Sequence, residues 1–213
     1  GYHELAYLHP NVFTPNENFL KELGVEKNEK YAIIRFVAWN ATHDIGHRGF
    51  SKEKKIKLVT ELSRYIKVFI SSEGDLPEEL KEYQMKIKPE NMHNALYYAQ
   101  LLVGESATMA SECAMVGTPA IYINNSHFGS LDSQAEYGLV HLFSEDELAQ
   151  EHAIQKAIEI VSKPDIKNEY RERAQKMLEN KIDVTSFMIW FVENYPESVK
   201  EVKSPEFSFD RFK

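Results

Sequence analysis

The residues best suited to chemistry lie between Gly104 and Glu112, where an apolar segment gives way to a helical one. Ser106 and Thr108 fall at the first turn of that helix, where free backbone N–H groups and the positive end of the helix dipole attract anions. Glu112 follows Ser106 by about a turn and a half, a depth at which its carboxylate accepts hydrogen bonds from ribose hydroxyls. The string predicts a phosphate and ribose half-site. The alternative is that Ser106 is a simple N-cap and Glu112 a solvated helix residue.

A second group of chemically capable side chains lies in the loop of residues 39–49. His43, Asp44 and His47 are candidate catalytic residues there, next to an arginine and two glycines. Imidazoles and a carboxylate also suit a transition metal, so a metal-dependent hydrolase is a further alternative. Because the loop offers no helical spacing and no obvious fourth ligand, we expect no metal and favour a loop that contacts pyrophosphate or takes part in catalysis.

Four further polar residues are expected to line the same cleft: Arg35, Ser72, Glu73 and His93. Arg35 lies within a predicted strand and needs a partner, either Glu73 or the ligand itself. His93 opens a helix, where a local hydrogen bond is the competing interpretation. A serine-hydrolase elbow, Gly-x-Ser-x-Gly, is missing from the sequence. Gly-x-Gly-x-x-Gly is also missing after the first predicted strand, so NAD binding at that turn is unsupported.

These residues must be positioned by alternating strands and helices. Short apolar runs predict about six strands, and 3.6-residue periodicity predicts helices between them. Such alternation predicts an α/β fold, a Rossmann-like doubly wound parallel sheet of order 3-2-1-4-5-6 with the ligand at the carboxyl ends of the strands. We expect a lead-in or interdomain linker over residues 1–30, a nucleotide-sugar-binding domain over 31–195 and a tail over 196–213. The predicted strands are 31–38, 68–72, 85–87, 101–103, 120–123 and 141–143, and the main helices 51–65, 77–83, 89–99, 106–116, 144–161, 165–180 and 185–194.

Composition narrows the class of partner. The 213 residues carry a formal net charge of −8, which disfavours broad nucleic-acid or membrane-surface binding. No apolar run reaches the length of about 18 residues that a transmembrane helix needs. The single cysteine, Cys113, excludes an intrachain disulfide and favours a reducing compartment, so we expect a cytoplasmic protein.

The motifs of this sequence resemble those of a known protein family. The segment from Gly104 to Gly117-Thr-Pro119, preceded by Met92-His93, resembles the C-terminal half of GT-B-type proteins. It is most similar to a bacterial and archaeal family of unknown function, related to UDP-N-acetylglucosamine 2-epimerases and glycosyltransferases. The opening Tyr2-His-Glu-Leu-Ala-Tyr-Leu-His-Pro10 and the loop at His43 are similar to that family too.

The resemblance implies roles for individual residues. Gly104, Ser106, Ala107 and Thr108 would bind the diphosphate of a UDP-sugar or another nucleotide-sugar, and Glu112 its ribose. Two departures stand out. The pair Ser106-Ala107 replaces a common glycine pair, and the loop after the first strand lacks the His-Arg-rich pattern of the epimerases.

The resemblance also implies a partner for this chain. The parent protein would be a glycosyltransferase or an epimerase-like enzyme whose N-terminal domain is missing here, and no further cofactor is required. We expect the domain alone to bind ligand weakly and to turn nothing over. A non-catalytic binding or assembly module of the same fold is the alternative.

Overall fold

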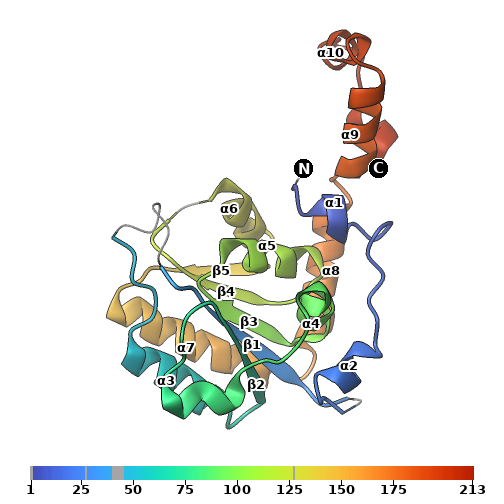
Figure 1. Ribbon diagram of the computed structural model, residues 1–213. Coiled ribbons are helices and arrows are strands. Elements are labelled where there is room, and N and C mark those ends of the chain that lie inside the picture. Colours follow the sequence, from blue (N-terminus) through green and yellow to red (C-terminus); the bar gives the residue numbers. More distant parts are fainter. Residues whose placement is uncertain (1, 27, 40–45, 127) are drawn as a thin grey trace.

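The computed structural model describes residues 2–26, 28–39, 46–126 and 128–213. Its centre is a sheet of five parallel strands in the order β2-β1-β3-β4-β5 (Figure 1). This confirms the predicted α/β, Rossmann-like parallel sheet. The strands are β1 (Tyr31–Phe36), β2 (Lys67–Ser72), β3 (Leu101–Gly104), β4 (Ala120–Ile123) and β5 (Val140–Phe143).

Burial explains why the central strands are apolar throughout. Every residue of β3 and β4 is buried, as is all of β1 except Arg35. Helices on both faces of a parallel sheet leave no wet face, so the strands are continuous apolar runs and do not alternate. The register pairs Arg35 with Ser71 on one side and with Gly104 on the other, which brings two predicted site residues, Arg35 and Gly104, next to each other.

Helices cover both faces of the sheet. In Figure 1, α3 and α7 lie on one face, and α4, α5, α6 and α8 lie on the other. Helix α5 packs against the sheet, α4, α6 and α8, which accounts for the burial of its last seven residues. The helices are α3 (Lys52–Leu62), α4 (Met92–Tyr98), α5 (Ala107–Met115), α6 (Gly129–Glu136), α7 (Glu147–Ser162) and α8 (Ile166–Leu178).

The structure differs from the sequence prediction in three elements. Residues 85–87 do not form a strand. A single bridge joins Gln84 to Ile70, with Met85 N donating to Ile70 O at 2.8 Å, so the described sheet has five strands where about six were predicted. The helix predicted over 77–83 is the 3-10 helix η2 (Glu78–Tyr83), and a second, η3 (Pro89–Asn91), precedes α4. Helix α6 was not predicted at all.

The two ends of the chain meet outside the sheet. The lead-in contains α1 (Leu5–Leu8) and α2 (Phe19–Glu22), and Leu5, Leu8 and Phe19 are buried in the core. Beyond α8 the chain leaves the body as an arm of α9 (Val184–Glu193), α10 (Glu197–Val202) and η4 (Phe209–Phe212), which projects beside α1 (Figure 1).

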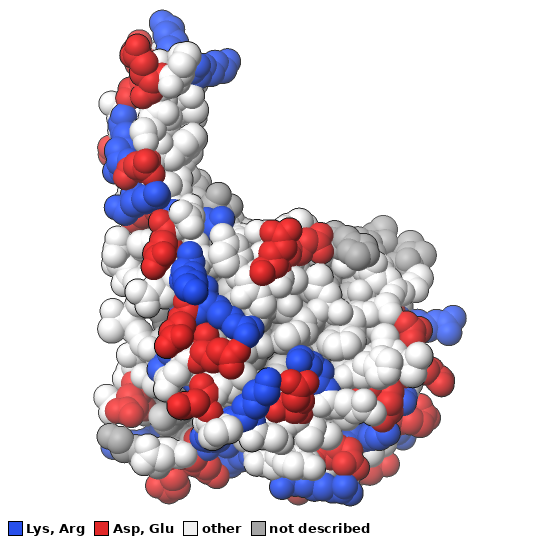
Figure 2. Space-filling model, turned by 180° about the vertical axis from the view of Figure 1, so that it is seen from behind, with Lys and Arg blue, Asp and Glu red and all other residues white. Residues whose placement is uncertain are grey.

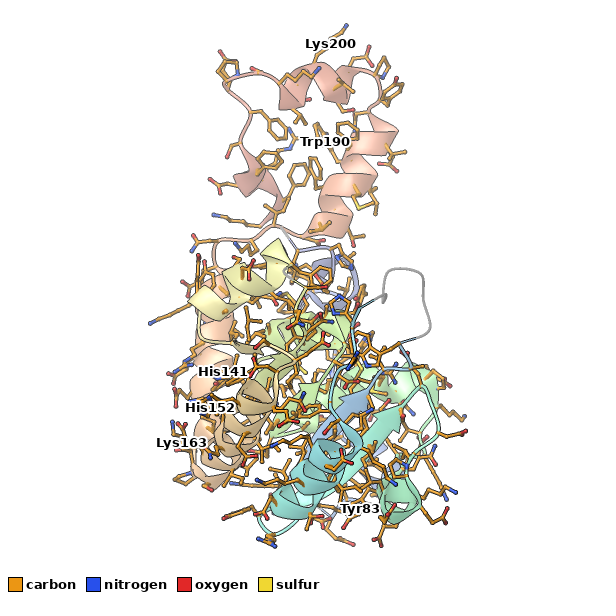
Figure 3. All side chains as sticks on the ribbon, turned by 90° about the vertical axis from the view of Figure 1, so that its left-hand side faces the viewer. Tyr83, His141, His152, Lys163, Trp190 and Lys200 are labelled. Carbon is orange, nitrogen blue, oxygen red and sulfur yellow. The ribbon has the colours of Figure 1, made fainter. Side chains whose placement is uncertain are left out.

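The arm is stabilised by its own aromatic side chains. The guanidinium of Arg211 lies 4.1 Å from the ring centre of Trp190. Figure 3 shows Trp190 between the two limbs of the arm. The tail thus returns onto α9, which the sequence had placed in the domain of residues 31–195. The ring cluster comprises Phe187, Trp190, Phe191, Phe207, Phe209 and Phe212.

Charge is distributed without a large patch of one sign on the face shown in Figure 2, where acidic and basic side chains alternate. Ion pairs such as Lys54–Glu151 and Lys67–Glu29 join side chains of opposite sign. Among the described helices, none is both long enough and apolar enough to cross a membrane.

Candidate functional site

The turn from β3 into α5 forms the centre of the candidate site. A Cβ on Gly104 would lie 2.7 Å from both Cβ and O of Arg35, so only glycine allows β3 to approach β1 this closely. Ser106 is the N-cap of α5, and its hydroxyl accepts a hydrogen bond from Met109 N at 3.4 Å. In the described part of the chain, the N–H groups of Ala107 and Thr108 have no protein acceptor. The turn therefore presents free donors at a helix N-terminus.

Glu112 is buried on the same helix. Its side chain is 9% exposed, and its Oε1 accepts hydrogen bonds from Tyr7 Oη and His93 Nε2, both at 3.1 Å. The rings of Tyr7 and His93 stack with centroids 5.2 Å apart. Burial and the negative charge of Glu112 raise the pKa of Tyr7. Both hydrogen bonds go to Oε1 of Glu112. A ligand hydroxyl would therefore donate to the other carboxylate oxygen, Oε2.

Glu105 is a residue of the candidate site that the sequence prediction missed. It is 3% exposed and accepts hydrogen bonds from Val37 N at 2.8 Å and Phe50 N at 2.6 Å, which lie at the two ends of the loop after β1. Burial raises the pKa of Glu105. The positive charge of Lys55 and the hydrogen bonds from the two amides lower it, but the effect of burial is larger. Glu105 fixes this loop beside the start of α5. The sequence shows only that Glu105 directly follows the glycine that ends a predicted strand, and it does not show that this carboxylate is buried.

His47 joins three loops at the same edge of the sheet. Its Nδ1 donates to Glu145 Oε1 at 2.6 Å, and its Nε2 lies 3.1 Å from Ser126 Oγ. The second oxygen of Glu145 accepts from Arg48 N at 2.7 Å and from Gly49 N at 3.1 Å. The loops after β1, β4 and β5 are thereby held together, although the sequence did not predict any role for Glu145.

The metal hypothesis names three ligands. Two of them, His43 and Asp44, lie outside the described residues. The third, His47, has both ring nitrogens engaged with Glu145 and Ser126, and one of these contacts would have to break for it to bind a metal. Within the described ranges, no three His, Cys, Asp or Glu side chains are grouped so that they could hold a metal ion.

The other predicted cleft residues fall into two groups. Arg35 forms an ion pair with Glu73, one of the two partners considered for it, and also donates to Ser71 Oγ at 2.8 Å. Ser72 donates to the carbonyl of Gly74 at 2.9 Å. This group lies at the carboxyl ends of β1 and β2, whereas His93 contacts Glu112 on α5.

A pocket of ≈ 180 Å³ lies between the carboxyl ends of β4 and β5 and the start of α6. It continues from Ser126 and is therefore adjacent to His47. Its lining combines aromatic and apolar side chains with amide, hydroxyl and carboxylate groups. The lining residues are Tyr122, Asn124, Asn125, Ser126, Phe128, Leu131, Asp132, Leu142, Phe143 and Ser144.

Comparison with known proteins yields structural likeness only, since no family model and no curated protein sequence matches. The S. aureus MnaA–UDP co-structure matches with a TM-score of 0.56 at 12% identity, over 82% of this chain and 46% of that one. A UDP-N-acetylglucosamine 2-epimerase matches at 0.51 and 15%, over 80% and 43%. The spinosyn rhamnosyltransferase SpnG with thymidine diphosphate matches at 0.51 and 13%, over 79% and 46%.

This chain has a GT-B-like fold. It corresponds to the C-terminal domain of such proteins and spans less than half the length of the three structures named above. The five-stranded parallel sheet of order 2-1-3-4-5 agrees with that assignment. Sequence identities of 12–15% establish the fold alone, because one fold serves proteins with different ligands.

Proposed function

We propose that this GT-B-like domain binds a nucleotide-sugar, with the diphosphate at the N-terminus of α5 and the ribose at Glu112. The observation that carries the proposal is the arrangement of one helix. Its first turn offers the unpaired N–H groups of Ala107 and Thr108, and the carboxylate of Glu112 lies deeper on the same element.

The diphosphate half of the proposal follows from electrostatics. The helix is nine residues long, begins at the carboxyl end of a central parallel strand, and has no acidic residue in its first turn. Such an end carries a partial positive charge and donors in fixed directions. The hydroxyl of Ser106 adds a donor, because it can donate its hydrogen to a phosphate oxygen while its own oxygen accepts from Met109 N at 3.4 Å.

The ribose half follows from the position of Glu112. Tyr7 and His93 bind Oε1 from one side and hold the carboxylate in a single orientation. A carboxylate fixed in this way loses little further entropy when ribose hydroxyls donate to its second oxygen. The solved complexes of similar fold with UDP and with thymidine diphosphate support a nucleoside diphosphate as the ligand.

In a parent enzyme, the same helix end would stabilise the departing nucleoside diphosphate of a sugar donor. Acid or cationic assistance would come from the loop after β1, where His47 is oriented by Glu145. Such a half-site would serve a glycosyltransferase and an epimerase-like enzyme alike, so the reaction would depend on groups outside it.

Calorimetric titration with UDP, UDP-N-acetylglucosamine and GDP tests this proposal. We expect heat with at least one nucleotide and a roughly tenfold weaker UDP affinity in Glu112→Ala, because a charge-assisted hydrogen bond is lost. Inorganic pyrophosphate should bind both proteins alike, since it has no ribose. Glu172→Gln, on the exposed face of α8, is the matched control. Folded protein that shows no heat with any nucleotide would rule the proposal out.

A non-catalytic binding or assembly module is the second candidate, favoured by one observation. Four large apolar side chains on and just beyond α9 are exposed to between 52% and 71%: Met188, Ile189, Val192 and Tyr195. Their spacing places them along one side of the helix. Binding to a second protein that is lost in Val192→Asp, together with no nucleotide binding, would favour this candidate.

A further inference from the structure

A serine, a histidine and a glutamate from three different loops are joined in a row beside the pocket at the ends of β4 and β5. Ser126 Oγ lies 3.1 Å from His47 Nε2, and His47 Nδ1 lies 2.6 Å from Oε1 of Glu145. In this order of groups, the imidazole can activate the hydroxyl as a nucleophile and the carboxylate orients the imidazole. Such triads are defined by geometry and not by sequence position, so the missing Gly-x-Ser-x-Gly elbow does not exclude one.

The imidazole of His47 is oriented as a general base requires. Glu145, whose side chain is 6% exposed, accepts a hydrogen bond from Nδ1. In the neutral ring the lone pair therefore lies on Nε2, the atom that contacts Ser126. Two backbone N–H groups hold the second oxygen of Glu145, and the ring of Trp39 stacks on that of His47 with centroids 5.7 Å apart. The base is thus fixed before a substrate arrives.

Side-chain amides next to Ser126 can stabilise an oxyanion. Ser126 N donates to Oδ1 of Asn124 at 2.6 Å, which fixes this amide beside the serine. Since Oδ1 is the acceptor there, Nδ2 is the donor end of the amide, and no described residue accepts a hydrogen bond from it. Asn125 is held in the same way by Glu145 N at 3.0 Å. Both asparagines line the pocket, so fixed donors lie where negative charge would develop.

The pocket beside Ser126 has room for a small apolar group. Its volume of ≈ 180 Å³ is below the roughly 300 Å³ at which pockets for drug-sized ligands begin. The carboxylate of Asp132 is also part of the lining, which disfavours a negatively charged group. We therefore expect a short, uncharged acyl group. The aromatic and aliphatic side chains of the lining are Tyr122, Phe128, Leu131, Leu142 and Phe143.

We propose that Ser126 and His47, with Glu145 as a positioning residue, hydrolyse esters of short, uncharged carboxylic acids. Ser126 Oγ attacks the carbonyl carbon while His47 Nε2 takes its proton, the C–O bond to the alcohol breaks, and His47 gives the proton to the departing oxygen. Water then attacks the acyl-serine with His47 as base, and the proton returns to Ser126 as the acid leaves. One ester and one water give one acid and one alcohol. The reaction uses neither the start of α5 nor Glu112, so it does not depend on nucleotide binding.

Hydrolysis of 4-nitrophenyl esters tests the activity. We expect turnover of the acetate and butyrate and little of the decanoate, which exceeds the pocket. Ser126→Ala and His47→Ala should each lower kcat/KM about a hundredfold or more, because the nucleophile or the base is lost. Ser130→Ala and His152→Ala, both at exposed positions, are the matched controls and should keep the wild-type rate. No turnover of any ester, or an unchanged rate in Ser126→Ala, would overturn the proposal.

Covalent labelling of the unaltered protein identifies the nucleophile without turnover and without a variant that must fold. In the reaction with diisopropyl fluorophosphate, a bond forms between the serine oxygen and phosphorus, fluoride leaves, and the neighbouring base takes the proton. We expect mass spectrometry to find the adduct on Ser126 and to find much slower labelling in His47→Ala. Labelling of Ser126 no faster than that of the exposed Ser130 would contradict an activated hydroxyl.

Glu145→Gln tests the positioning role. The substitution keeps the size of the side chain but removes its charge, so His47 becomes a weaker base while the pocket keeps its shape. We expect a fall in kcat of about tenfold or more at an unchanged KM. An unchanged kcat, or a change in KM alone, would show that Glu145 only holds the loops together.

Discussion

The imidazole of His47 donates from Nδ1 to Oε1 of Glu145 at 2.6 Å, across 98 residues of sequence. This contact joins the loop after β1 to the loop after β5, and Ser126 adds the loop after β4 through the second ring nitrogen. A carboxylate only accepts hydrogen bonds, so Nδ1 of His47 carries a proton, and Nε2 is the atom that contacts Ser126. These three loops at the carboxyl end of the sheet are thereby held as one unit.

Removing the carboxylate of Glu145 should release these loops. Burial opposes ionisation of Glu145, but hydrogen bonds from Arg48, His47, Asn125 and Gly49 outweigh it and lower the pKa. In Glu145→Ala we expect faster hydrogen exchange at Arg48 and Gly49 and a loss of about 2 kcal/mol of stability. The exposed Glu147→Ala, at the start of α7, is the control. Unchanged exchange at both amides would show that Glu145 does not hold the loop.

The lowered pKa of Glu145 gives its contribution a pH dependence. The folded protein binds the proton less well than the unfolded chain, so the stabilisation is present above the ordinary value of 4.5 and is lost as pH falls through the lower folded value. Urea unfolding of wild type and Glu145→Gln should therefore differ most at neutral pH and converge in acid. A difference that grows as pH falls would contradict the assignment.

Gly49 should tolerate alanine much less well than Gly24. Both have a positive φ, +58° and +69°, so both substitutions carry a similar backbone strain. A Cβ on Gly49 would lie 2.1 Å from Oε1 of Glu105, whereas one on Gly24 meets nothing within 4 Å. We expect Gly49→Ala to cost about 1–3 kcal/mol more than Gly24→Ala in denaturant unfolding, because overpacking a buried contact is destabilising. Equal costs would show that the Glu105 contact is easily displaced.

His141 should make stability depend on pH in a second window. Burial, with the positive charges of Lys156, Arg173 and Lys163, lowers its pKa to about 4 from 6.5, and its Nε2 lies 2.6 Å from Tyr170 Oη. A folded pKa below the unfolded one means that stability is full above pH 6.5 and is lost as pH falls toward 4. NMR titration of the His141 ring should show it neutral at pH 5.5. A midpoint near 6.5 would contradict this prediction.

Trp190 should stabilise the arm and leave the body unaffected. Its ring contacts Phe187, Phe207 and Phe212 within the arm, and no residue of α9 is buried. In Trp190→Ala we expect amides of residues 184–213 to lose protection from hydrogen exchange while those of β1 and β3 keep it. Met188→Ala, at a side chain that is 56% exposed, is the control. Loss of protection throughout the chain would show that the arm and the body unfold together.

Much of the architecture can be predicted from the sequence because it depends on local patterns. The apolar runs at 31–36, 101–104 and 120–123 can be stable only when both faces are covered, and their alternation with helices implies parallel pairing. The N-cap at Ser106 is local as well, since its hydroxyl bonds within three residues. Residues 85–87 were assigned incorrectly because a three-residue segment with two apolar side chains, Met85 and Ile87, does not show how many of its backbone groups find a partner.

The tertiary structure decided which polar residues meet. Glu105 and Glu145 are ordinary acidic residues in the sequence, and their roles depend on donors 55 to 97 positions away, Phe50 N and Arg48 N. Nor does the sequence indicate that Tyr7 reaches Glu112 across 105 residues. Helix periodicity and capping are read within a few positions, whereas burial of a charge depends on whichever segment folds over it. The sequence by itself determined the sheet and the helix N-terminus at Ser106, and only the folded chain determined how the loops around them are held.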